Sequence, residues 1–203
     1  MSVRVGEFLI RGDVEPWQRL GLTVVDAVAH VGTVRLRFEP GDGGLRGLVG
    51  WGLVDAATGA TDIDGLATTH VDGWDGAAPV NELDIVGFDH VVVNTSSLDR
   101  TCGAIEAATG APLKRVREAG PGVRQGFHRL GEVIVEVVES ARVTSPTAAF
   151  WGFVWNVADL HEVCERLGPD VVGLPKAAVQ PGRFIATVRG SVGLGLPLAL
   201  MTP

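Results

Sequence analysis

One pattern of strand-forming and turn-forming residues occurs twice in the sequence, and this repeat constrains the fold more than any other feature. Residues 85–140 and 150–203 both follow the order strand, helix and three strands. The earlier copy begins with GFDHVVVN and the later copy with FWGFVWNV, both rich in β-branched and aromatic residues. The repeat therefore predicts an α+β fold built from tandem βαβββ modules.

Helix boundary signals support the register of the repeat. In the earlier copy, Ser96 or Ser97 precedes the helical stretch as a potential N-cap, and Gly110 follows it. In the later copy, Asp159 and Gly168 stand in the same places. We therefore expect one helix directly after the first strand of each module.

A weaker copy of the pattern occupies residues 5–57, which we interpret as a degenerate N-terminal module. The stretch 56–80 is rich in Gly, Ala, Asp and Thr, a composition typical of a linker or lid. The predicted division of the chain is a degenerate module at 1–60, a linker or lid at 61–83, and modules at 84–142 and 148–203.

Composition excludes several classes of function. The chain has 203 residues and a formal net charge of −7, and its 17 cationic residues are scattered, which disfavours nucleic-acid binding. No apolar run reaches the roughly 18 residues that span a membrane, and the N-terminus lacks the pattern of an export signal. We therefore expect a cytoplasmic protein with a small-molecule partner and no membrane or nucleic-acid partner.

Tandem βαβββ units resemble the vicinal oxygen chelate superfamily, which includes glyoxalases, bleomycin-resistance proteins and extradiol dioxygenases. The resemblance is carried by FDHVVVNTSSLDRT, RQGFHRLGEVIVEVVE and QPGRFIATVRGSVGLGLPLALMTP, and it covers roughly residues 85–203. It implies curved mixed sheets around a cavity, with a divalent metal held by residues of the first and last strand of each module.

Carried onto this sequence, the resemblance makes His90 the first-strand ligand of the earlier module and Glu136 its last-strand ligand. Strand alternation agrees, because His90, Val92 and Asn94 share one face of their strand. A carboxylate within the run VIVEVV needs a cation or a hydrogen-bond donor when it is buried. His90 and Glu136 are therefore the candidate catalytic pair and the tentative metal ligands.

The later module departs from the ligand pattern. Gly152 stands where the repeat places His90, and the last-strand position falls near Leu198 or Ala199, in a segment without acidic residues. Two ligands are fewer than a catalytic metal ordinarily needs, unless His128, Gln125, His70 or a neighbouring subunit completes the set. We therefore expect no complete cofactor site, with a bound divalent metal as the alternative.

Further residues are candidates for contacts with a ligand. Arg124 or Arg129, depending on strand parity, could hold a carboxylate or phosphate. Trp151, Phe153 and Trp155 alternate opposite Gly152, and we interpret them as core residues packed against the helix. The predicted ligand-binding residues are Arg124, Gln125, Phe127, Arg129, Gly152, Asn156 and Arg183.

Three functions remain open. The first is a metal-free protein that binds a small apolar or aromatic ligand, which we favour because the later module lacks its ligand residues. The second is a metal-dependent lyase, isomerase or dioxygenase, and the third is a metal-free acid–base enzyme that uses His90 and Glu136. An odd N-terminal module would need a partner, so we also expect a homodimer.

Overall fold

The computed structural model describes residues 2–41, 46–56, 58–76 and 79–203. Residues 1, 42–45, 57 and 77–78, which belong to the predicted N-terminal module and linker, lie outside the described residues. Within the described part of the chain, no helix is long and apolar enough to cross a membrane.

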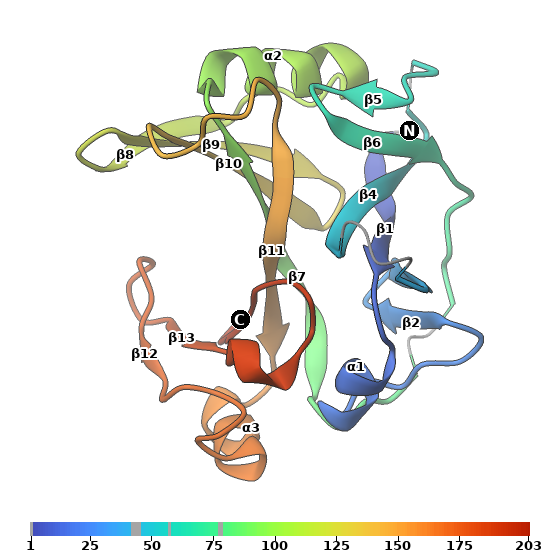
Figure 1. Ribbon diagram of the computed structural model, residues 1–203, viewed down its shortest axis with the longest axis vertical. Helices are drawn as coiled ribbons and strands as arrows, with labels where there is room; N and C mark the ends of the chain where they lie inside the picture. The colour runs from blue at the N-terminus through green and yellow to red at the C-terminus, as the bar shows by residue number, and fades with distance from the viewer. Residues whose placement is uncertain (1, 42–45, 57, 77–78) are drawn as a thin grey trace.

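The second half of the chain forms an eight-stranded mixed sheet from two βαβββ modules, as the repeat predicts (Figure 1). The strand order is β12-β13-β14-β11-β7-β10-β9-β8. The first module consists of β7 (Ile85–Thr95), α2 (Leu98–Thr109), β8 (Arg115–Gly120), β9 (Val123–Leu130) and β10 (Val133–Ser140). The second consists of β11 (Ala149–Val157), α3 (Leu160–Leu167), β12 (Lys176–Ala177), β13 (Phe184–Thr187) and β14 (Leu198–Met201), with a 3₁₀ turn, η1 (Gly190–Val192), before its last strand.

Each module joins its first strand to its last in parallel, and the two modules meet where β7 pairs antiparallel with β11. Ser97 caps α2 by accepting a hydrogen bond from the Arg100 amide, and Asp159 caps α3 in the same way through the Glu162 amide. The sheet curves strongly, so that β8 and β12 at its ends project to the same side (Figure 1). We call that side the concave face.

The first half of the chain forms a six-stranded sheet with the order β2-β3-β1-β4-β6-β5. Its elements are β1 (Arg4–Arg11), α1 (Glu15–Arg19), β2 (Val28–Val31), β3 (Val34–Glu39), β4 (Gly47–Val54), β5 (Asp62–Ile63) and β6 (Leu66–His70). The pattern of pairing matches the middle six strands of the larger sheet: β1 is parallel to β3, β4 is parallel to β6, and β1 is antiparallel to β4. The smaller sheet is therefore a shortened version of the larger one.

The pairing of β4, β5 and β6 can be compared with the predicted N-terminal module and linker. Strands β5 and β6 lie within the predicted linker 61–83 and pair with each other and with β4. The N-terminal half thus contains two shortened units that pair within the chain. The prediction of a homodimer rested on a single odd module, so it stays a prediction without that support.

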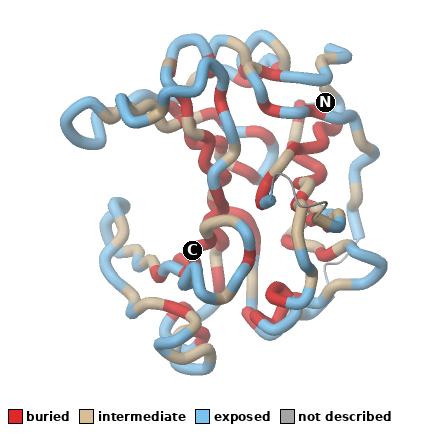
Figure 2. The backbone as a smooth tube through the Cα atoms, viewed as in Figure 1, coloured by how far each residue is buried: buried red, intermediate tan, exposed pale blue. Residues whose placement is uncertain are grey.

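An apolar core fills the space between the two sheets. The Phe8 ring of β1 lies 5.3 Å from the Phe88 ring and 4.9 Å from the Phe153 ring, measured between centroids. Trp17 of α1 approaches Trp155 at 5.9 Å. Burial of such side chains contributes roughly 1.5–3 kcal/mol each, and Figure 2 shows the buried segments concentrated between the sheets.

Phe153 and Trp155 are core residues, as predicted, but they pack against the N-terminal sheet. Trp151 is half exposed.

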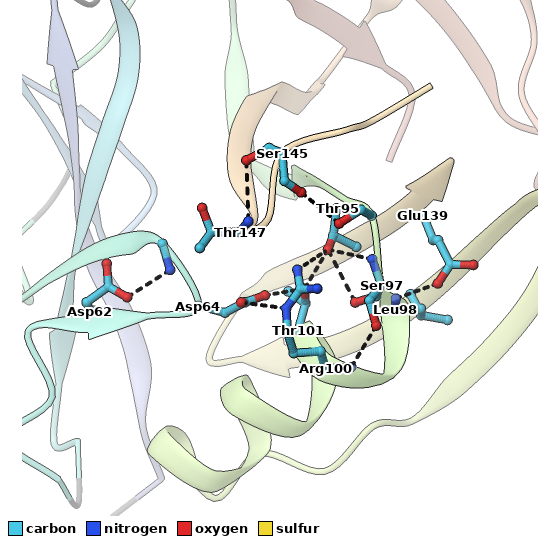
Figure 3. A network of polar contacts seen from close by, with 12 residues as sticks. Asp62, Asp64, Thr95, Ser97, Leu98, Arg100, Thr101, Glu139, Ser145 and Thr147 are labelled. Atoms are coloured by element: carbon cyan, nitrogen blue, oxygen red, sulfur yellow. Dashed lines mark hydrogen bonds and ion pairs between the residues drawn. The ribbon is translucent and has the colours of Figure 1, made fainter. Parts of the chain in front are cut away.

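A polar contact fixes the N-terminal sheet to helix α2 (Figure 3). The Asp64 carboxylate, in the turn between β5 and β6, accepts hydrogen bonds from Thr101 Oγ1 at 2.5 Å and from Arg100 Nε at 2.8 Å. The Asp64 carbonyl accepts a further bond from the Ala148 amide. Thr95 bonds both Thr101 and Arg100, so this network ties β5, α2, β7 and the start of β11 together.

Candidate functional site

The candidate site lies at the centre of the concave face, where a β-bulge in β7 turns two polar side chains to the same side. Opposite β11, His90 pairs with Val154 and Phe88 pairs with Trp155, so Asp89 is the extra residue. In such a bulge two residues of one strand oppose one of its neighbour. Asp89 and His90 therefore meet, and the distance from His90 Nδ1 to Asp89 Oδ1 is 2.7 Å.

His90 contacts a second carboxylate through its other ring nitrogen. Its Nε2 lies 3.1 Å from Oε2 of Glu136 on β10, the residue predicted as its companion. Gln125 of β9 donates from Nε2 to Oε1 of Glu136 at 2.5 Å. The predicted pair is thus brought together by three neighbouring strands.

Guanidinium groups close the two ends of this network. At one end, Arg183 donates to Asp89 Oδ2 at 2.8 Å and to Asn156 Oδ1 at 2.6 Å. At the other end, Arg117 Nε donates to Gln125 Oε1 at 2.5 Å. We call the chain Arg183, Asn156, Asp89, His90, Glu136, Gln125 and Arg117 the polar network.

The two carboxylates of the network titrate differently. Burial raises the pKa of the Glu136 carboxyl, although the charges of His90 and Arg117 oppose the effect. Burial acts to raise the pKa of Asp89 as well, but hydrogen bonds from His90 and Arg183 outweigh it, and the pKa of Asp89 is lowered. Asp89 therefore remains a carboxylate under conditions in which Glu136 can hold a proton.

The contacts of His90 provide a path for proton transfer. When Nδ1 donates to Asp89, a proton held between Nε2 and Glu136 Oε2 can be carried by either atom. The two atoms are 3.1 Å apart, within hydrogen-bonding distance. The pair could therefore take a proton from a bound molecule or return one to it.

The other predicted ligand contacts divide between the two faces of β9. Phe127, Gln125 and Arg129 lie on the concave face, since Phe127 pairs with Glu136 and Arg129 with Ile134. Arg124 lies on the opposite face, where its guanidinium pairs with Glu139 at 2.9 Å.

Gly152, predicted as a ligand-binding residue, does not leave open space for a ligand. A Cβ atom at this position would overlap the carbonyl oxygen of Pro197, which accepts the Phe153 amide at 3.0 Å. The absent side chain therefore makes room for the backbone of Pro197.

A second bulge, in β11, is the counterpart of the one in β7. Val92 pairs with Gly152 and Val93 with Phe150, which makes Trp151 the extra residue. Phe150 and Phe153 both face the core, so Trp151 and Gly152 are both turned toward the concave face. Trp151 thus occupies the position of Asp89, and about half of its surface is exposed.

An apolar wall lies on the same face as Trp151. Val154, Ala199 and Met201 form a small cluster separate from the main core, with Ala178 and Ile185 packed against it. Met201 pairs with Asn156, so this apolar wall on the second module adjoins one end of the polar network.

Sequence reasoning assigned no role to Asp89 or Arg117, and its prediction of Trp151 as a core residue is wrong. The adjacent Asp and His were visible in the sequence, but alternation alone places neighbouring residues on opposite faces. The bulge that reverses this has no clear sequence signal.

Two cavities, of about 330 and 350 Å³, lie elsewhere. One is lined by His30, Asn81, Asp84 and Val86 among others, and the other by Arg19, Asp170 and Ser191 among others. Neither includes a residue of the polar network.

Comparison with known proteins begins with two negative results: no family model and no curated protein matches the sequence. Among solved structures, methylmalonyl-CoA epimerase from Mycobacterium tuberculosis superposes with a TM-score of 0.52 at 16% identity. The match covers 62% of this chain and 93% of the epimerase.

The chain has the vicinal oxygen chelate fold.

A second methylmalonyl-CoA epimerase gives a TM-score of 0.49 at 20% identity, covering 61% of this chain and 99% of that one. The Streptomyces coelicolor enzyme, in a complex with 2-nitronate-propionyl-CoA, gives 0.46 at 19% identity, covering 57% and 95%.

Strand register shows which residues of this vicinal oxygen chelate fold stand at the four expected ligand positions. Because Val92 pairs with both Glu136 and Gly152, and Val154 pairs with both His90 and Ala199, the two-fold relation of the modules equates His90 with Gly152 and Glu136 with Ala199. The four positions therefore carry one imidazole, one carboxylate and two residues without donors.

These residues do not fit the metal site of the fold. Asp89 adds a third polar side chain, but the two carboxylates contact opposite nitrogens of His90 and do not converge on one point. Among the described residues, no group of three His, Cys, Asp or Glu side chains is arranged to hold a metal ion. His70 lies on the other sheet and contacts Ala60, while His128 faces Ala111 near α2.

The same four positions can be found in the N-terminal sheet. Glu7 pairs with Gly52, and Leu9 pairs with Gly50 and Arg37, which makes Glu7 the counterpart of His90 and Arg37 that of Glu136. Arg37 Nε and Nη2 donate to the Glu7 carboxylate at 3.1 and 2.9 Å. The shortened sheet thus has an ion pair where the larger sheet has His90 and Glu136.

The outer face of the N-terminal sheet is covered by residues 71–75, which we call the strap. Val71 fills the space above Gly6 and Gly52, Asp72 accepts a hydrogen bond from Arg35 through its carbonyl, and Trp74 stacks on His30 at 3.9 Å. The corresponding concave face of the larger sheet has no such cover among the described residues (Figure 1).

Proposed function

We propose that the protein binds a small molecule with a flat apolar body on the concave face, with the body against Trp151 and the apolar wall and a polar end at the His90–Glu136 pair. The observation that carries this proposal is the half-exposed Trp151, held beside the polar network by a bulge. A large aromatic side chain left in solvent next to buried polar groups is typical of a ligand-binding surface.

The test is calorimetric titration of the purified protein with 1-naphthol and a panel of aromatic compounds. We expect Trp151→Ala to weaken binding at least about tenfold, the equivalent of 1.4 kcal/mol. Trp74→Ala is the matched control, because Trp74 stacks on the outer face of the other sheet, and it should bind as the wild type does. If no compound binds, or if Trp151→Ala binds equally well, the proposal is wrong.

A second candidate function is metal-free proton transfer. It is favoured by the contact between Glu136 and His90 Nε2, since a buried carboxyl with a raised pKa is a stronger base when ionised. Glu136 would take a proton from a carbon next to a carbonyl group, and the same carbon would regain a proton from solvent through the pair.

Deuterium exchange separates catalysis from binding. Methylmalonyl-CoA is one sensible probe, because the Mycobacterium tuberculosis protein of this fold is named for its epimerisation. We expect exchange to be lost in Glu136→Gln with binding retained, and exchange that survives the substitution would remove Glu136 from the reaction.

The metal-dependent alternative is tested by elemental analysis. If the purified protein contains about one divalent metal ion per chain and His90→Ala contains none, the metal-dependent function is supported and both metal-free proposals are wrong.

A further inference from the structure

Three arginines share the concave face on the arm formed by β8 and β9. Arg115 pairs with Phe127, and Arg117 pairs with Gln125, so both lie on the face that carries the Gln125 and Phe127 side chains. Arg129 lies two residues beyond Phe127 on the same strand and therefore on the same face. Figure 1 shows this arm projecting at one end of the curved sheet.

Within the described part of the chain, these arginines have no direct partner of opposite charge, although the charge of Arg117 acts on the buried Glu136 carboxyl. Arg115, Arg117 and Arg129 form no ion pair with any residue that the structure describes. The partners seen are neutral: Arg117 donates to Gln125 and lies 5.8 Å above the Phe127 ring, and Arg129 donates to the Glu132 carbonyl at 3.4 Å.

The opposite face of the same arm shows the contrast. Arg124 is paired there with Glu139 at 2.9 Å and with Asp99 at 3.6 Å. The chain has a net charge of −7, so it has enough carboxylates to pair every arginine. Three cations left unpaired on one face of such a protein form a local positive field.

The Arg117 guanidinium is already partly oriented. Its hydrogen bond to Gln125 and its position over Phe127 restrict the side chain, which lowers the entropy that binding would cost. A planar guanidinium donates two parallel hydrogen bonds to a carboxylate or phosphate.

We propose that Arg115, Arg117 and Arg129 bind an oxyanion group, phosphate or carboxylate, of the ligand. The inference that this oxyanion belongs to the same ligand rests on the proposed function. The oxyanion site itself can be tested independently. Strands β8 and β11 are four strand spacings apart, about 19 Å along the sheet. A molecule that reaches both Trp151 and these arginines therefore spans the concave face from one module to the other.

The oxyanion site is tested with inorganic pyrophosphate, titrated at low ionic strength and followed by calorimetry. We expect saturable binding in the millimolar range that weakens with added salt. Arg115→Gln combined with Arg117→Gln should weaken binding about tenfold or more, while Arg19→Gln, which removes a single positive charge on α1, should leave it unchanged.

Two further measurements distinguish phosphate from carboxylate as the bound group, and the oxyanion site from the proposed function. Malonate in place of pyrophosphate shows whether the site prefers carboxylates or phosphates. Trp151→Ala should bind pyrophosphate as the wild type does. A wild-type protein that binds pyrophosphate but no naphthol therefore counts against the proposed function and not against this site. Absence of saturable pyrophosphate and malonate binding, or equal binding by the double arginine variant, would overturn the inference.

Discussion

The two sheets of this protein place the same strand positions in different surroundings. In the N-terminal sheet, Glu7 and Arg37 form an ion pair, and the strap crosses the face beside them. In the larger sheet, His90 Nε2 lies 3.1 Å from Glu136 Oε2, and no strap crosses the face among the described residues. The difference shows that the fold itself does not require a ligand site. One copy has an ion pair under a strap, whereas the other has a titratable pair on a face that no strap covers among the described residues.

The largest effect is expected where the two copies differ in backbone packing. Gly152→Ala would force a Cβ into the Pro197 carbonyl oxygen, whereas the counterpart Gly50→Ala would place its Cβ 3.1 Å from the Ala67 oxygen. We expect the first to lower the free energy of unfolding by about 3 kcal/mol and the second by about 1 kcal/mol. Urea denaturation measures both, and equal losses would show that the two glycines are under the same constraint.

A smaller effect is expected from the counterpart polar pairs. Glu7→Gln leaves Arg35 and Arg37 without their carboxylate, and we expect a loss of about 2 kcal/mol, reduced from the fully buried case because Arg37 is 45% exposed. Glu136→Gln removes a carboxylate that burial disfavours, so the expected change is under about 0.5 kcal/mol. Urea denaturation at neutral pH tests this, and a larger loss from Glu136→Gln would mean that the open site is structural.

A substitution in the strap should lower the free energy of unfolding by a smaller amount. Val71→Ala takes two methyl groups from the space above Gly6 and Gly52, and we expect a loss of about 1 kcal/mol. Val86→Ala, at a valine that is 56% exposed, is the control and should be neutral. If thermal unfolding shows no difference between the two variants, the strap contributes little to closing the N-terminal face.

The smallest effect concerns pH. Burial lowers the pKa of His128 on the larger sheet and of His30 under the strap, each below the ordinary value of 6.5. The unfolded chain therefore binds more protons than the folded one as pH falls below about 6.5, and stability is lost in that direction. His128→Gln should flatten the fall in unfolding free energy between pH 7.5 and 5.5, and an unchanged slope would contradict the buried environment of His128.

Local signals in the sequence predicted much of the larger sheet. The caps at Ser97 and Asp159 and the β-branched strands are determined by neighbouring residues, and both βαβββ modules were confirmed. The pairing of β4 with β6 was not predicted, because it depends on strands too short to give a periodic pattern and on contacts between distant residues.

The candidate site was predictable only where alternation holds. His90 and Glu136 were assigned from the family resemblance with support from alternation, and their side chains lie in contact. Asp89 and Trp151 join the same face because of bulges, which shift the parity of a strand by one residue. Arg124 and Arg129 could be separated only when the pairing of β9 with β10 was known.

The bulges have a consequence for how such a protein can acquire new chemistry. The central strands carry an extra residue at four equivalent places, and these are Gly6, Val49, Asp89 and Trp151. An extra residue has no cross-strand partner, so its side chain can be exchanged without altering the register of the neighbouring strands. The four copies of this bulge position thus carry a glycine, a valine, an acidic residue and a tryptophan. The bulge position is therefore a suitable place to randomise when variants are selected for new ligands.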